Sequence, residues 1–136
     1  MNTVAVKLIQ KHEGLRTSPY TDTVGKLTIG YGRCLDTAGI SLPEAEFMLN
    51  NDITACETDL RNFSFWPRLN ECRQAALIDM RFNLGGRGLR AFTHFLAALD
   101  MDDYVGAAEE MLHSKWATQV GNRAIELSKI IKTGAV

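Results

Sequence analysis

Two carboxylic acids near the N-terminus, Glu13 and Asp22, stand nine residues apart in contrasting surroundings. Glu13 follows an amphipathic helical stretch, and the negative end of a helix dipole favours the protonated form of a carboxyl group. Asp22 lies in a polar turn, where a carboxylate can stay ionised. Cleavage of a glycosidic bond needs both forms, because one group protonates the leaving oxygen while the other activates water or attacks. The pair indicates a glycoside hydrolase, although each residue alone is more often structural.

Thr28 follows Asp22 by six residues, in a segment that alternates apolar residues with Thr28, Gly30 and Gly32. This alternation predicts a strand, with the Thr28 hydroxyl on the same face as the two glycines. Missing side chains on that face would leave space for a ligand. A bulge or bend is the more common reason for glycine in a strand. The spacing alone therefore leaves the question open.

The elements that must position these residues are mostly helical. Thr3 to His12 predicts a short amphipathic helix, and Pro19 suggests an edge strand or irregular loop. Ser41 and Glu44 form a capping-box pattern that begins a helix running to about Arg61. Further helices are predicted over about 70–84 (ending at Gly85-Gly86), 91–99, 104–114 and 123–132. The fold class is α+β and mainly α. We expect a β lobe over about 12–40, a connecting helix over 41–61, and a helical lobe of 62–136 that includes the N-terminal helix.

Composition excludes several classes of protein. The 136 residues are 46% hydrophobic and 23% charged, as in a folded single domain. A net charge of −1 argues against a general nucleic-acid binder. The sequence shows no apolar run of membrane-spanning length and no signal-peptide pattern. Three cysteines without a CxxC pair predict free thiols, and the three histidines share no ligand spacing, so no metal site is expected.

Several segments closely resemble the phage-type lysozymes, glycoside hydrolase family 24. The active-site segment of that family is matched by His12–Arg16, Tyr20–Thr23, Gly25 and Leu27–Gly32. The matches continue in order through Arg81–Gly85, Gly88, Phe92-Thr93, Ala107-Ala108, Ser114–Trp116, Gln119 and Asn122–Ala124. The resemblance spans nearly the whole chain. It departs at Arg33, where a well-known member has a histidine, and at Leu35–Ser41, which looks shortened.

The resemblance implies a lysozyme-like fold and a role for each site residue. Glu13 would be the general acid, Asp22 the base that positions a hydrolytic water, and Thr28 a second holder of that water. The family inverts anomeric configuration, which requires carboxyl groups roughly 6.5–9.5 Å apart. The substrate would be bound by Phe82 at the cleft wall, by Gly30, by Arg123 beside Glu13, and by Gln119 in support. From the residues alone, Phe82 could equally be core, and Arg123 could tie helices together.

The implied function is that of an endolysin. Such a muramidase hydrolyses the β-1,4 bonds between N-acetylmuramic acid and N-acetylglucosamine in peptidoglycan and releases phage by lysing the host. The resemblance implies a monomer with no metal or organic cofactor. It also implies accumulation in the host cytoplasm, with a separate holin giving access to the periplasm and cell wall. The alternatives are a non-catalytic peptidoglycan-binding module of the same fold and an enzyme acting on chitin or chitosan.

Overall fold

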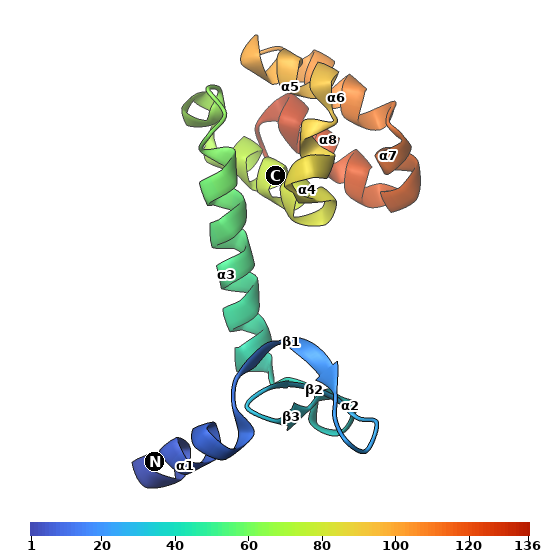
Figure 1. Cartoon of the computed structure of the whole chain (residues 1–136). Helices are drawn as coiled ribbons and strands as arrows, with labels where there is room; N and C mark the ends of the chain where they lie inside the picture. The colour runs from blue at the N-terminus through green and yellow to red at the C-terminus, as the bar shows by residue number, and fades with distance from the viewer. The chain divides into compact units, whose positions relative to one another are not determined.

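The computed structural model describes the whole chain, Met1–Val136, and divides it into two units, Met1–Phe47 and Met48–Val136. The boundary falls inside helix α3, Leu42–Leu60 (Figure 1). The chain is mainly helical, at 68%, with one small three-stranded antiparallel sheet. This content confirms the predicted α+β class. The finer division into a β lobe, a connecting helix and a helical lobe that includes the N-terminal helix stays a prediction.

The first unit begins with helix α1, Thr3–Glu13. The Asn2 side chain caps its start by accepting a hydrogen bond from the Ala5 amide at 3.1 Å. Gly14, at a φ of 68°, ends it, and the Gly14 amide donates to the Gln10 carbonyl at 3.0 Å. Glu13 is therefore the last helical residue, at the negative end of the helix dipole, as the sequence predicts.

The sheet of this unit consists of β1 (Arg16–Thr21), β2 (Leu27–Gly30) and β3 (Arg33–Cys34), in that order. Pro19 lies on the edge strand β1, where its missing amide proton disrupts no ladder. The sequence predicts that the strand containing Thr28 extends to Gly32, whereas β2 ends two residues earlier, at Gly30. Gly30, with a φ of 70°, leaves the extended conformation and leads into the Tyr31-Gly32 turn, so the alternation stops there.

Helices α2 (Leu35–Ala38) and α3 complete the unit. The predicted capping box begins α3, because the Ser41 hydroxyl accepts from the Glu44 amide at 3.3 Å and Glu44 Oε2 accepts from the Ser41 amide at 2.7 Å. The same Glu44 oxygen accepts from Arg33 Nη1 at 2.6 Å. The hydrogen bond from Arg33 is the main reason that the pKa of Glu44 falls to about 2. Arg33, the departure from the family pattern, thus fastens β3 to the start of α3.

The second unit packs its helices around one hydrophobic core. After the end of α3 come a 3-10 turn at Trp66–Arg68 and helices α4 (Glu71–Arg90), α5 (Thr93–Asp100), α6 (Tyr104–Leu112), α7 (Lys115–Val120) and α8 (Asn122–Thr133). The largest fully buried side chains are Leu60, Phe65, Leu77, Met80, Leu89, Phe95, Leu99, Met111 and Ile131. Trp66 and Trp116 are also buried. No helix of the chain is both long enough and apolar enough to cross a membrane.

The predicted end of a helix at Gly85-Gly86 is confirmed, and a second helical stretch follows it within α4. Gly85 has a non-helical φ of 76° and ψ of 166°, which separates the first stretch from the one that runs on to Arg90. A glycine adopts a positive φ of this kind without steric cost. The sequence prediction lacks α7. Ser114 caps the start of this helix, because its hydroxyl accepts a hydrogen bond from the Ala117 amide at 3.1 Å.

An ion-pair cluster on Asp59 joins α3 to α4 within this unit. Arg81 Nε donates a hydrogen bond to Asp59 Oδ2 at 2.6 Å. Arg90 donates to both carboxylate oxygens, from Nη2 to Oδ1 at 2.6 Å and from Nη1 to Oδ2 at 3.0 Å. The hydrogen bonds from Arg90 and then Arg81 lower the pKa of Asp59 from 3.8 to about 2. Paired, bidentate geometry of this kind is the strong form of the arginine–carboxylate interaction.

The depressed pKa of Asp59 predicts a stability that depends on pH. Because the folded-state pKa lies below the ordinary value, the cluster stabilises the fold fully above about pH 4 and loses that contribution as pH falls towards about 2. Asp59→Asn should lower the free energy of unfolding by about 1–2 kcal/mol at pH 6, and the difference from wild type should vanish near pH 2. Urea unfolding followed by tryptophan fluorescence would measure it. Asp52→Asn, an exposed change on the same helix, is the matched control, and a difference for Asp59→Asn that does not change with pH would contradict the assignment.

Candidate active site

Glu13 presents its carboxyl group to the turn that follows β2. A Cβ atom placed on Gly32 would lie 2.6 Å from Glu13 Oε2 and 2.9 Å from Glu13 Cδ. Gly32 also has a φ of 80°, which side-chain-bearing residues rarely adopt. The absence of a side chain at Gly32 therefore leaves room for the carboxyl group of Glu13. Glu13 itself is exposed within its unit.

Gly32→Ala tests this close approach. We expect the new methyl group to push the Glu13 carboxyl group aside and to lower hydrolytic activity at least about tenfold, since misplacing a reacting group by 1 Å can reduce the rate by far more. The strained backbone should lower stability by about 1 kcal/mol. Gly39→Ala is the control, because Gly39 has a φ of 58° but open space around its Cβ position. Equal activity of the two variants in a cell-wall clearing assay would show that the contact with Glu13 has no role.

Asp22 is held in its turn through one carboxylate oxygen. Asp22 Oδ1 accepts from the Val24 amide at 2.9 Å and from the Lys26 amide at 2.8 Å, and the Asp22 amide donates to the Lys26 carbonyl at 2.8 Å. Oδ2 makes no hydrogen bond within the protein. The turn thus fixes the side chain and leaves one oxygen available to a ligand or a water.

Thr28 lies on β2 with its side chain buried at 3% exposure. Its hydroxyl donates to the Lys26 carbonyl at 3.0 Å. A hydroxyl has a single proton, so Thr28 Oγ1 can only accept any further hydrogen bond. The Lys26 carbonyl therefore holds both the Asp22 backbone and the Thr28 hydroxyl. Gly30 stands two residues further on, with open space where its Cβ would be.

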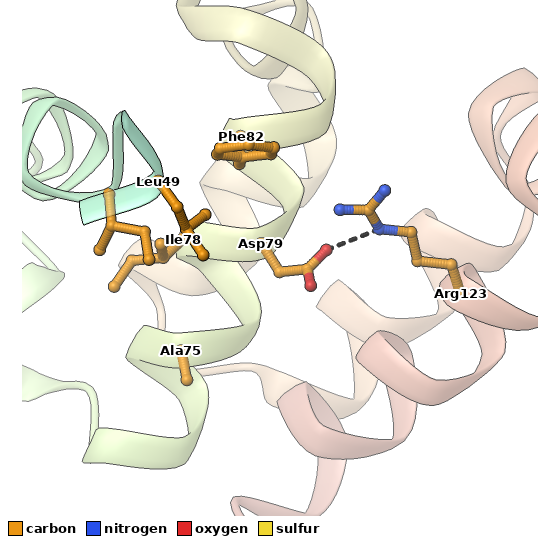
Figure 2. Close-up of a pocket in the computed structure, with 7 residues that line it drawn as sticks. Leu49, Ala75, Ile78, Asp79, Phe82 and Arg123 are labelled. Carbon is orange, nitrogen blue, oxygen red and sulfur yellow. Dashed lines mark hydrogen bonds and ion pairs between the residues drawn. The ribbon is translucent and has the colours of Figure 1, made fainter. Parts of the chain in front are cut away.

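The second unit contributes a hollow of about 440 Å³. Figure 2 shows Phe82 and Asp79 on one side of α4 and Arg123 reaching towards Asp79 from α8. Arg123 Nε donates to Asp79 Oδ1 at 2.7 Å. The hollow is lined by Leu49, Ile53, Ala75, Ile78, Asp79, Phe82 and Arg123. At 45% exposure within its unit, Phe82 is not a core residue. Its ring is free to contact a ligand.

Arg123 connects two helices, which is one of the two roles that the sequence leaves open for it. Its ion pair with Asp79 joins α8 to α4. Sequence reasoning missed Asp79, although its place three residues before Phe82 puts the two on one helix face. Gln119 is exposed on α7 and makes no side-chain hydrogen bond. Glu13, Asp22, Thr28 and Gly30 thus lie in the first unit, and Phe82 and Arg123 line one hollow of the second. The proposed approach of Arg123 to Glu13 stays a prediction.

The model of the phage lysozyme family matches residues 10–130, which includes every one of these residues. The chain belongs to the phage lysozyme family. It is 26% identical to the pre-baseplate central spike protein Gp5 of Enterobacteria phage T4, over 98% of this chain but only 28% of the length of that protein. It is also 23% identical to probable T4-type lysozymes 1 and 2 of Dictyostelium discoideum, over 95% of this chain and 94% of each relative.

Membership of the phage lysozyme family supports a peptidoglycan hydrolase of the muramidase type. No group of three histidine, cysteine, aspartate or glutamate side chains is placed to hold a metal ion. The three cysteines are free thiols, and burial raises the pKa of Cys56, which makes that thiol a poor nucleophile.

Proposed function

We propose that the protein is a muramidase that hydrolyses the β-1,4 bond between N-acetylmuramic acid and N-acetylglucosamine in peptidoglycan. The observation that carries this proposal is the contrast between two carboxyl groups in one unit. Glu13 ends a helix beside Gly32, whereas Asp22 is fixed by two amides through Oδ1 and keeps Oδ2 free. A glycoside hydrolase needs one acid and one base of this kind.

Glu13 acts as the general acid. It is the last residue of α1, and the absence of a side chain at Gly32 leaves room for its carboxyl group. In the reaction, the Glu13 proton passes to the glycosidic oxygen as the bond from that oxygen to the anomeric carbon breaks. The leaving sugar departs as an alcohol, and solvent later returns a proton to Glu13.

Asp22 and Thr28 orient the attacking water together. Asp22 Oδ2 accepts one proton of the water, and Thr28 Oγ1 accepts the other, since its own proton is committed to the Lys26 carbonyl. The lone pair of the water then points to the anomeric carbon, and Asp22 takes the proton as the new bond forms. Attack by water from the face opposite the leaving group inverts the configuration at that carbon.

The resemblance implies substrate-binding roles for residues of each unit, each unit taken by itself. Phe82 offers an exposed aromatic face to a sugar ring, and Gly30 leaves space beside Thr28. Asp79 holds the Arg123 guanidinium in place. The roles that the resemblance implies for Arg123 beside Glu13, and for Gln119 as support, belong to the same proposal.

The biological role that follows is that of a phage endolysin. We propose a monomer that needs no cofactor, accumulates in the host cytoplasm, and reaches the periplasm and cell wall once a holin has permeabilised the membrane. The free phage would be released when the wall fails. This assignment is supported by membership of the phage lysozyme family.

Chloroform-treated Gram-negative cells and purified sacculi test the activity. We expect the protein to clear the cell suspension and to release soluble glycan fragments from the sacculi. A protein that sediments with sacculi but releases nothing would be the non-catalytic binding module instead. Cleavage of chitin or chitosan oligomers in preference to sacculi would identify the third alternative.

A further inference from the structure

One peptide group connects the proposed base to the proposed water holder. The carbonyl between Lys26 and Leu27 accepts from the Asp22 amide at 2.8 Å and from the Thr28 hydroxyl at 3.0 Å. The amide of the same peptide group, on Leu27, donates to Asp36 Oδ2 at 2.7 Å. Because a peptide group is planar, whatever fixes the direction of its N–H also fixes the direction of its C=O.

Asp36 reaches this amide from outside the sheet. β3 pairs with β2 at Thr28↔Cys34 and Ile29↔Arg33, and the chain then leaves the strand to form α2. No residue of β3 therefore stands opposite Leu27 to accept its amide proton. The Asp36 carboxylate, in the first turn of α2, supplies the acceptor that the strand does not. A hydrogen bond from an amide to a carboxylate is stronger than a ladder bond between neutral groups.

We infer that Asp36 is a positioning residue for hydrolysis. It orients the Lys26–Leu27 peptide, whose carbonyl aims the Thr28 hydroxyl and holds the Asp22 turn. In this inference Asp36 contacts neither the attacking water nor the substrate. This inference rests on the proposed roles of Asp22 and Thr28.

A purely structural role for Asp36 is distinguishable from this one. An acidic residue in the first turn of a helix stabilises that helix through its charge. Asp36→Asn removes the charge but keeps an oxygen at the same distance from the backbone. Asp36→Glu keeps the charge but moves the oxygens out by one methylene. The positioning role predicts that the asparagine variant works and the glutamate variant does not, and the helix-charge role predicts the reverse.

Steady-state kinetics on soluble glycan fragments separate the two roles. We expect Asp36→Ala and Asp36→Glu to lower kcat about fivefold to tenfold, with KM within about twofold of wild type, as for loss of an interaction that orients reacting groups. Asp36→Asn should keep kcat within about twofold. Glu46→Ala, an exposed change in the same unit, is the control. An unchanged kcat in Asp36→Ala, or an asparagine variant as slow as alanine, would overturn the inference.

Amide hydrogen exchange provides a readout that does not depend on activity. In Asp36→Ala, the Leu27 amide should exchange at least about tenfold faster than in wild type, while the Gly14 amide, bonded to the Gln10 carbonyl, should not change. An unchanged Leu27 rate would contradict the inference. If the wild-type protein has no hydrolytic activity, the proposed function fails, and the exchange rate then decides separately whether Asp36 holds this peptide.

Discussion

Glu13→Gln is expected to lower the rate of peptidoglycan hydrolysis by about a hundredfold to ten-thousandfold, the range over which general acid catalysis contributes. The amide has nearly the same shape as the carboxyl group but has no acidic proton for the leaving oxygen. Since Glu13 is exposed and makes no hydrogen bond to the protein, the fold should not change. Clearing of chloroform-treated cells, at equal concentrations of folded protein, measures the loss.

The control for this variant is Glu46→Gln, which makes the same chemical change at an exposed position of the same unit. It should clear cells at the wild-type rate. If Glu13→Gln clears cells as fast as Glu46→Gln does, Glu13 is not the acid. Circular dichroism and the thermal midpoint of both variants confirm that equal amounts of folded protein are compared.

Asp22→Asn should be equally damaging to activity and mild for the fold. Asparagine keeps an oxygen that can accept from the Val24 and Lys26 amides, so the turn should survive. What changes is the second atom, because an amide nitrogen in place of Oδ2 donates to water instead of accepting its proton. We expect a loss of about a hundredfold to ten-thousandfold in kcat with little change in KM.

For Asp22→Asn the matched change is Asp52→Asn, at an exposed position on α3. The thermal midpoints of wild type and both variants should lie close together. Retention of more than about a tenth of the wild-type kcat by Asp22→Asn would remove this carboxylate from the role of base. A large drop in its thermal midpoint would instead show that the turn needs both carboxylate oxygens.

The parts of the site that could be predicted from sequence are those built by short-range hydrogen bonds. Glu13 ends a helix because Gly14 follows it, and Asp22 sits in a turn that closes on Lys26. The capping box at Ser41 is equally local. Each of these structures is encoded within a few residues, so the surroundings of the two carboxyl groups follow from the local sequence.

The other parts of the site and of the fold could not be predicted from the sequence. They depend on contacts between residues that are distant in the chain, or on backbone angles that composition does not reveal. Asp79 and Arg123 are 44 residues apart, and only packing of α8 on α4 brings them together. The structure that follows a glycine is also not encoded by the glycine itself. A turn follows Gly30, whereas a second helical stretch follows the non-helical Gly85. The identity of Phe82 is likewise compatible with a buried or an exposed position, and only its neighbours in the fold decide between the two.

The chemical ends of the released glycan show whether Glu13 and Asp22 direct water to the anomeric carbon of N-acetylmuramic acid. Sacculi are digested in ¹⁸O-labelled water, and the fragments are analysed at once by mass spectrometry. We expect reducing ends on N-acetylmuramic acid that carry one labelled oxygen. Anhydro ends without label, or reducing ends on N-acetylglucosamine, would contradict it.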